Sequence, residues 1–340
     1  MKIISMCLLL CLLWAPPRAS AASPSSKDLQ RQDFSGKNFD GADLSGASLF
    51  GTSFRGASLI GANLSKAQMR GSNLTSANMR GADLTGVQAH GSFLLNADLS
   101  GAKLSAADLT GVDMIEATAR EADFSGSQMS GVNFFQAILT GSKFVKAQLN
   151  SSHLNQVDAA GCDFSDTMMM AADFSQANLS GAKFDRAKAH GIYFFRAKLS
   201  GASLVEAVLG GADAIGADFE GADLSKSHLG TAVFSSADLN SAKLDEADAH
   251  GAFFEWADLS GASLRKTNLP NAKLQHAWLK GADLSEANFT EAHLEDADLT
   301  GAVTEGTSFE GAVYDSGTKL PFSEQEASKR GMIRSLATGT

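Results

Sequence analysis

The sequence predicts an all-β solenoid in which the chain turns after every block of five residues. Large side chains recur at every fifth position from Phe34 to Tyr314 without a slip in register, which makes 57 consecutive blocks. The central residue of a block is Leu, Phe or Met with few exceptions. The residue two positions earlier is small from Ala42 to Ala312, apart from Ile192.

A period of five excludes the two common regular structures. A helix advances about 100° per residue, so apolar residues five apart would spiral around it and form no stripe. A plain strand alternates with period two, and the Gly found in most blocks weakens both helices and strands. The chain must therefore turn at each block, with the large and the small residue facing inward together.

Blocks of the form A-[DN]-[LF]-[ST]-G, such as ADLSG at 42–46, resemble the pentapeptide repeat family. The resemblance extends from Gln32 to about Asp315 and implies a right-handed quadrilateral parallel β-helix with four blocks per coil. Residues 20 apart in sequence then lie in neighbouring coils at about 4.8 Å, and the blocks make a rigid rod of roughly 70 Å.

Two sequence columns test the 20-residue register. Opposite charges alternate at every twentieth position of one column, through Asp83, Lys103, Asp123, Lys143, Asp163 and Lys183. The adjacent inward column holds Phe124, Phe144, Phe164 and Phe184, which predicts an aromatic ladder. Exposed ion pairs are worth only about 0.2 to 1 kcal/mol each, so we expect the buried Leu and Phe columns to supply most of the stability.

The ends of the chain predict four segments. Residues 1–21 are typical of a signal peptide, with Lys2, an apolar run over 3–15 and small residues at 19–21. Residues 22–31 form a polar lead-in, 32–315 the repeats, and 316–340 a C-terminal cap and tail. Ser323 and Glu326 have capping-box spacing before a short helix that we expect to end near Gly331.

The leader predicts an exported protein, resident in the periplasm, outside the cell, or in the thylakoid lumen of a cyanobacterium. We expect no stable membrane anchor, because the apolar run is short and Cys11 lacks the context of a lipidation signal. Removal of the leader leaves Cys162 as the only cysteine. An intramolecular disulfide is then impossible.

The composition argues against nucleic-acid binding and against catalysis. The formal net charge is −10, which disfavours a phosphate-binding surface. The many Asp residues follow the repeat, so they do not indicate a paired acid and base. The run at 168–170 is three Met residues, and a core position at Met169 explains it better than soft-metal binding. We expect no enzyme activity and no cofactor.

Three histidines share the context Ala-His-Gly with an aromatic residue shortly after it: His90, His190 and His250. Their separations are multiples of 20, so they are expected on one side of the coil. At five and three coils apart, about 24 and 14 Å, they are too distant to share a metal ion. The sequence therefore predicts no metal site.

Large apolar residues also occupy positions where the repeat expects water-facing ones, on one predicted side. These candidates for an interaction surface are Phe93, Leu95, Ile115, Phe135, Tyr193, Phe195, Ile215, Phe253 and Trp256. Trp278 is a further tryptophan outside the core columns. One possibility is a contact surface, either for another protein or for a second copy of this chain. The other is that these side chains fold back onto the wall.

The sequence thus predicts an exported, non-enzymatic scaffold that presents an acidic wall with an apolar strip to an unknown protein partner, with a homodimer as one possibility. The family resemblance implies an alternative, because some cytoplasmic members mimic duplex DNA and bind type II topoisomerases. The leader and the interspersed Lys residues oppose that role. A secreted effector acting on host proteins is the third hypothesis.

Overall fold

The computed structural model describes residues 28–335, which fall into two compact units. Unit 1 ends at Asp158 and unit 2 begins at Ala159. The predicted signal peptide, 1–21, and most of the predicted lead-in, 22–31, lie outside the described residues.

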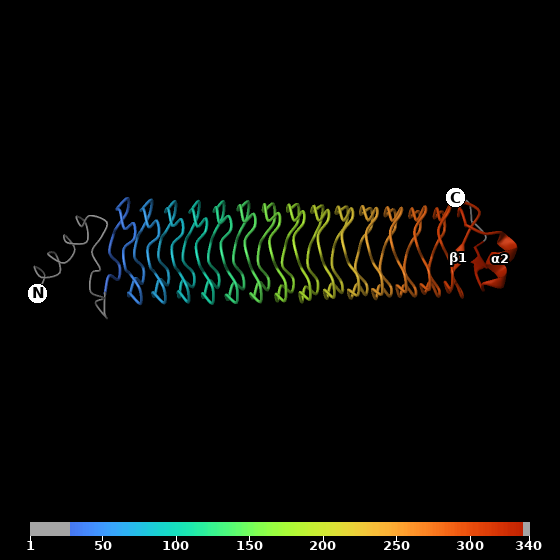
Figure 1. Cartoon of the computed structure of the whole chain (residues 1–340), viewed down its shortest axis with the longest axis horizontal. Coiled ribbons are helices and arrows are strands. Elements are labelled where there is room, and N and C mark those ends of the chain that lie inside the picture. The colour runs from blue at the N-terminus through green and yellow to red at the C-terminus, as the bar shows by residue number, and fades with distance from the viewer. Residues whose placement is uncertain (1–27, 336–340) are drawn as a thin grey trace, which may run out of the picture. The chain divides into compact units, whose positions relative to one another are not determined.

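Each unit is a stack of 20-residue coils, which can be followed from blue to green in unit 1 and from green to red in unit 2 (Figure 1). In unit 1, parallel bridges join Asp28 to Ser48 and Asp33 to Ser53, and the same spacing of 20 recurs along the unit. In unit 2, Asp163 pairs with Lys183 in the same way. The predicted 20-residue register is confirmed, with four bridged positions in each coil.

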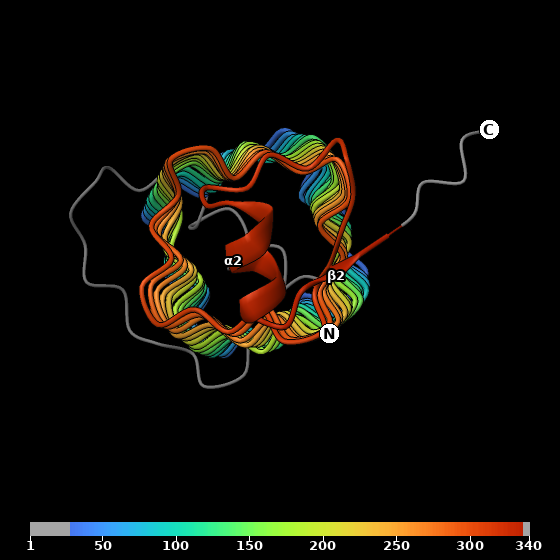
Figure 2. The same cartoon turned by 90° about the vertical axis from the view of Figure 1, so that its right-hand side faces the viewer.

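We name the four sides of the coil A to D in chain order. Side A contains the blocks centred on residue 34 and on every twentieth residue after it, and sides B, C and D start from the blocks centred on 39, 44 and 49. Sides A and C therefore face away from each other, as do B and D. The end-on view of Figure 2 shows the four-sided outline of the coils.

The walls consist of single bridges more than of continuous strands. Among residues 28–335 the strands of two or more residues are β1 (Val313–Tyr314) and β2 (Ile333–Arg334). Each side of the coil is one block long, so only one residue per side is bridged before the next corner turns the chain. The predicted all-β fold is thus built from isolated bridges.

The corners explain the recurrent glycine. At a typical corner the N–H of Ala62 donates to the carbonyl of Leu59 at 3.0 Å, and Gly61 between them has a φ of 63°. A positive φ at the third residue is the hallmark of a type II turn, which favours Gly because it has no Cβ. Other residues take the same conformation at many corners, Trp256 among them.

The interior is filled by the two inward columns, whose members are almost entirely buried. Phe124 and Phe144 of unit 1 stack with ring centroids 4.8 Å apart, and Phe164 and Phe184 of unit 2 stack at 4.9 Å. The predicted aromatic ladder is confirmed within each unit. Burial of each such side chain contributes about 1.5 to 3 kcal/mol. Cys162 lies buried in the small column, as predicted.

The Asp and Asn residues that precede the central residue do more than face water. Their side chains accept a hydrogen bond from the backbone N–H two residues later, as Asp258 does from Ser260 at 2.9 Å and Asn73 from Thr75 at 3.0 Å. This local bond satisfies a donor as the chain approaches its corner. It supplies a structural reason for the acidic residues that the repeat pattern alone did not give.

The predicted charge column lies on side C. Asp83 and Lys103 are bridged neighbours in unit 1, as are Asp223 and Lys243 in unit 2. Lys243 Nζ lies 3.7 Å from Asp223 Oδ2, with the Lys243 side chain largely exposed and the Asp223 side chain half-buried. Since such pairs contribute little each, their main effect is to keep like charges from stacking.

The register continues into the segment after Tyr314. Lys319 is bridged to Asp298, and β2 pairs in parallel with β1, Ile333 opposite Val313. Between them lies α2 (Glu324–Lys329), whose N-cap Ser323 accepts a hydrogen bond from the Glu326 N–H at 3.2 Å. The helix predicted from the capping-box spacing is present.

Helix α2 lies beside the last coil of unit 2 (Figures 1 and 2). Phe322, just before it, packs against Phe309 with ring centroids 5.8 Å apart. Arg330, just after it, donates to the carbonyl of Thr304 at 3.2 Å, and Ala327 is fully buried. Within residues 28–335 no helix has the length and hydrophobicity needed to cross a bilayer.

Candidate interaction surfaces

The nine apolar residues predicted as a contact surface all lie on side A of their units. Four belong to unit 1 and are called the unit 1 strip: Phe93, Leu95, Ile115 and Phe135. The other five, with one addition given below, form the unit 2 strip: Tyr193, Phe195, Ile215, Phe253 and Trp256.

The unit 1 strip is mostly half-buried. Leu95, Ile115 and Phe135 occupy the same position in three successive coils, linked by hydrogen bonds such as Glu116 N–H to the Phe135 carbonyl at 2.9 Å. All three side chains are half-buried. Phe93, on the other side of the central residue, is 48% exposed. Three of these four residues are thus partly covered, and Phe93 is the most exposed member of the unit 1 strip.

The unit 2 strip is more exposed. Tyr193, Ile215 and Phe253 are 47%, 38% and 36% exposed, and Phe195 is half-buried. Val233 bridges directly to Phe253 and carries the apolar surface across the coil between Ile215 and Phe253. Val233 is not among the nine candidates from the sequence, although its register position indicates it. With this addition each of four successive coils contributes at least one apolar side chain to the strip.

Trp256 is the most unusual member of the unit 2 strip. It stands at a corner with a φ of 62° and is 55% exposed. A bulky side chain in the left-handed region is an outlier that costs about 1 to 2 kcal/mol. Its indole stacks on the imidazole of His276 with ring centroids 4.0 Å apart and an interplanar angle of 14°. This stack holds a large aromatic face in place at the edge of the strip.

A cation borders the other end of the unit 2 strip. The guanidinium carbon of Arg196 lies 5.1 Å from the ring centroid of Phe195. Arg, Tyr and Trp are the residues most enriched at the energetic centres of protein interfaces. The unit 2 strip and the bordering Arg196 therefore bring all three residue types together on one side of one unit.

Other exposed apolar side chains lie elsewhere. Trp278, which the sequence analysis considered beside Trp256, lies on side B, bridged to Asp258 and Asp298. Its position in the 20-residue register predicts this placement. Phe50, Met168 and Met170 lie on side D and Ile60 on side B, all more than a third exposed.

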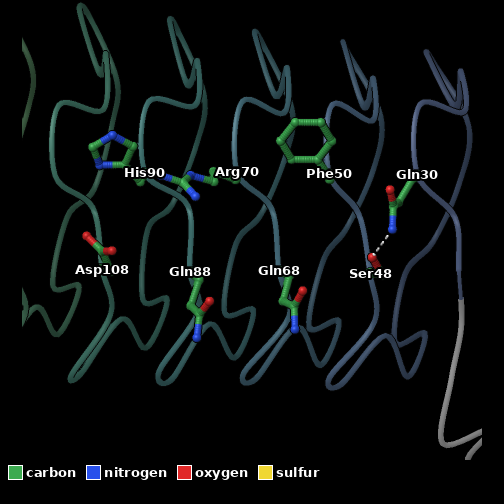
Figure 3. A pocket seen from close by; sticks show the side chains of 8 residues that line it. All are labelled: Gln30, Ser48, Phe50, Gln68, Arg70, Gln88, His90 and Asp108. Atoms are coloured by element: carbon green, nitrogen blue, oxygen red, sulfur yellow. Dashed lines mark hydrogen bonds between the residues drawn. The ribbon is translucent and has the colours of Figure 1, made fainter.

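Unit 1 also has a hollow on side D with a volume of about 440 Å³. Five successive coils line it, through Gln30, Ser48, Phe50, Gln68, Arg70, Gln88, His90 and Asp108. Figure 3 shows Gln68 and Gln88 in one row, with Phe50, Arg70 and His90 in the other. Gln30 donates from Nε2 to Ser48 Oγ at 2.7 Å. Among these residues, only His90 stands out in the sequence, through its Ala-His-Gly context.

Acidic and histidine side chains are spread along the coils. In the part of the chain from 28 to 335, no three His, Cys, Asp or Glu side chains are grouped so as to hold a metal ion. His90, His190 and His250 share side D of their units, at the position directly after the central residue.

Comparison with known proteins identifies the repeat. The family profile of pentapeptide repeats matches in eight copies, over residues 28–59, 52–88, 97–136, 120–156, 147–186, 192–230, 237–275 and 267–303. These matches cover well over half of the 340 residues. The chain belongs to the pentapeptide repeat family. Its members fold as right-handed β-helices and are generally non-enzymatic structural or interaction proteins, and the match points to no catalytic family.

Several solved pentapeptide repeat proteins are similar to this one. HetL, involved in heterocyst differentiation regulation in the cyanobacterium Nostoc sp. strain PCC 7120, is 24% identical with a TM-score of 0.28, covering 74% of this chain and 92% of HetL. A protein of the Arabidopsis thaliana thylakoid lumen is 29% identical with a TM-score of 0.25, covering 32% of this chain and 72% of its own.

Full-length QnrB1, a plasmid-mediated fluoroquinolone resistance protein, is 23% identical with a TM-score of 0.26, covering 70% of this pentapeptide repeat protein and 97% of QnrB1. Each of these TM-scores is below 0.5, so membership of the family rests on the sequence match. No curated protein matches the sequence significantly.

Proposed function

We propose that this pentapeptide repeat protein is an exported, non-enzymatic scaffold that binds another protein through the unit 2 strip. The observation that carries the proposal is the continuity of apolar side chains over four coils on one side of unit 2. Contiguous exposed apolar surface costs free energy in water unless a partner covers it. Isolated exposed apolar residues, such as Ile60, need no such explanation.

The composition of the strip favours a protein partner. Tyr193 and Trp256 offer large rigid faces with few rotatable bonds, and Arg196 adds a cation beside them. Such side chains supply most of the binding energy in protein interfaces, while the surrounding polar residues exclude water. A rigid coil also pre-organises them, so that little conformational entropy is lost on binding.

The electrostatic surroundings favour a partner with a basic rim. Asp213 is bridged between Tyr193 and Val233 inside the strip, and the chain as a whole carries a net charge of −10. Opposite charge on the partner would increase the association rate and orient the complex. A second copy of this chain brings the same acidic surface, so we favour a different protein over a homodimer.

Export is the other half of the proposal, and it rests on the leader in residues 1–21. Cell fractionation with N-terminal sequencing of the native protein tests it. We expect a product in the exported fraction that begins close to Ala22. A cytoplasmic product that retains Met1 would contradict export and would favour the topoisomerase-binding alternative.

The contact surface is tested with a pair of charge substitutions. Phe195→Glu with Ile215→Glu places two carboxylates in the unit 2 strip at outward positions, so we expect an intact fold and a loss of partner capture of tenfold or more. The matched control is Val205→Glu with Ser225→Glu, which adds the same charge at the equivalent positions of side C, two blocks after each strip residue.

Capture is measured by affinity purification from the exported fraction, and self-association by sedimentation. Loss of a heteromeric partner in the strip variant alone supports the proposal. Loss of a homodimer would assign the strip to self-association and contradict a different partner. Equal behaviour of the strip variant and the side C control would contradict the proposed surface.

A further inference from the structure

The hollow on side D of unit 1 is a trough between two rows of side chains (Figure 3). Five successive coils line it, which makes it about 19 Å long at the strand spacing. One row comes before the central residues of the blocks, and its members are Ser48, Gln68, Gln88 and Asp108. The other row comes after the central residues, and its members are Gln30, Phe50, Arg70 and His90. The volume of about 440 Å³ is that of an ordinary ligand site.

Long side chains make the second row tall over three successive coils. These side chains are Phe50, Arg70 and His90, and all three are exposed. After His90 the row continues with Thr110, whose short side chain does not line the trough. The guanidinium carbon of Arg31 lies 5.9 Å from the Phe50 ring centroid, and this contact helps to hold the ring. The trough therefore offers one flat apolar face beside a series of polar groups.

The polar side chains of the trough are available to a ligand. Four of them form no hydrogen bond or ion pair with the rest of residues 28–335: Gln68, Gln88, Arg70 and His90. Asp108, in the same row as the two glutamines, instead accepts a hydrogen bond from the backbone N–H two residues later at 3.1 Å. Water satisfies the four available groups in the free protein, and the hydroxyl groups of a ligand can take its place.

The wall beneath the trough disfavours a peptide ligand. The N–H of Leu49 donates to the carbonyl of Gln68 at 2.8 Å, and the next coil repeats this bond from Met69 at 2.7 Å. A peptide cannot add to this wall as a further strand, because these main-chain groups are already paired between coils. A peptide strand also rises about 3.3 Å per residue, so its residues fall out of step with coils about 4.8 Å apart. The net charge of −10 disfavours a nucleic acid.

We propose that this trough binds a linear β-1,4-linked oligosaccharide along the axis of unit 1. The sugar rings of such a chain follow one another in an extended line at nearly the spacing of the coils, so each ring meets both rows. Sugar hydroxyl groups donate and accept hydrogen bonds, as the amides of Gln68 and Gln88 do. Arg70 supplies donors and Asp108 acceptors, and their opposite charges favour an uncharged chain. Phe50 offers its flat face to the C–H groups of one ring.

The test uses the whole protein and two soluble hexamers, cellohexaose and chitohexaose, titrated by calorimetry. Maltohexaose is the matched ligand control, because it has the composition of cellohexaose but a curved α-1,4-linked chain. We expect at least one β-linked hexamer to bind tenfold or more tightly than maltohexaose. Gln68→Ala with Gln88→Ala should weaken that binding tenfold or more, and so should Arg70→Ala. Circular dichroism establishes that each variant is folded.

The matched control variant is Gln128→Ala with Gln148→Ala. These exposed glutamines continue the same row of unit 1 outside the trough, so their loss should leave binding unchanged. The proposal is overturned if neither β-linked hexamer binds more tightly than maltohexaose. It is also overturned if the Gln68 and Gln88 double variant binds as the wild type does, or if the control variant loses as much affinity.

Discussion

Lys319 Nζ lies 2.9 Å from Asp298 Oδ2, and this contact ties the segment after Tyr314 to the coil before it. Hydrogen bonds from Thr300 and from Lys319 lower the pKa of Asp298 to about 2, although partial burial opposes them. The same local hydrogen bond from the residue two positions later lowers the pKa of Asp83 and Asp283. The folded state thus holds several carboxylates in their ionised form.

This arrangement predicts a loss of stability in acid. The unfolded pKa of Asp is about 3.9, so these groups stabilise the fold fully above about pH 5. Their contribution falls as the pH drops through the lowered folded values, towards pH 2 for Asp298. Urea unfolding followed between pH 7 and pH 2 should show a constant midpoint down to pH 5 and a steep fall below pH 4. Asp298→Asn should make that fall shallower, and an unchanged profile would contradict the assignment.

The hydrogen bond from a backbone N–H to the Asp or Asn side chain two residues earlier predicts the effect of single substitutions. Asp258→Ala removes the acceptor of the Ser260 N–H, so we expect a loss of about 1 kcal/mol in the free energy of unfolding. Asp258→Asn keeps an oxygen at the same place, as Asn73 does for Thr75, and should be nearly neutral. Equal losses for Ala and Asn in denaturant titrations would assign the effect to charge and not to the hydrogen bond.

The stacked phenylalanines predict a contrast between inward and outward rings. Phe184 is fully buried, stacks on Phe164 at 4.9 Å and makes edge contacts with Phe174 and Phe194. Phe184→Ala leaves a cavity and should cost about 3 to 5 kcal/mol. Phe195→Ala, on the outer face of the wall, should cost about 1 kcal/mol or less. Similar costs in urea unfolding would show that the two columns are wrongly assigned.

Trp256 is expected to lower the stability of its corner while it contributes to partner binding. Trp256→Gly relieves the positive φ of 62° and should raise the free energy of unfolding by about 1 kcal/mol. It also removes the aromatic anchor, so partner capture should fall. The opposite substitution at a neighbouring corner, Gly261→Ala at a φ of 65°, should destabilise by a similar amount. A Trp256→Gly variant that loses stability would contradict this view of the corner.

We propose that α2 protects the open end of unit 2. Ala327 is fully buried, so Ala327→Asp should displace the helix and expose unpaired coil edges that aggregate. Gln325→Asp adds the same charge at an exposed position of α2 and serves as the control. Light scattering during heating should show earlier aggregation for Ala327→Asp alone. Equal aggregation of both variants would indicate a charge effect without a capping role.

The sequence predicted the coil because its period is a direct consequence of packing. A large residue every five positions with a small one two before it permits one inward arrangement, and the Phe164–Phe184 stack follows from the spacing of 20. The same register places Tyr193 and Phe253 on one side and Trp278 on another. The sequence alone therefore predicts which column and which side of the coil a residue belongs to.

The register does not predict the direction in which a side chain points. Register places His190 and His250 three coils apart, and nothing in it states that each ring leans over a glycine. Register also places Leu95 and Phe93 on one side, but it does not state that the first is half-buried and the second exposed. The hydrogen bond from Ser260 N–H to Asp258 depends on the geometry of the turn, and the sequence period does not reveal that geometry.

Site-specific photo-crosslinking tests the proposed contact surface most directly. A photoreactive phenylalanine analogue is placed singly at Tyr193 and Phe253 of the unit 2 strip, and at Val205 of side C as the control. The proposal predicts one adduct, with the same partner protein, from positions 193 and 253 and none from 205. An adduct from position 205 of equal yield, or different adducts from the two strip positions, would contradict it.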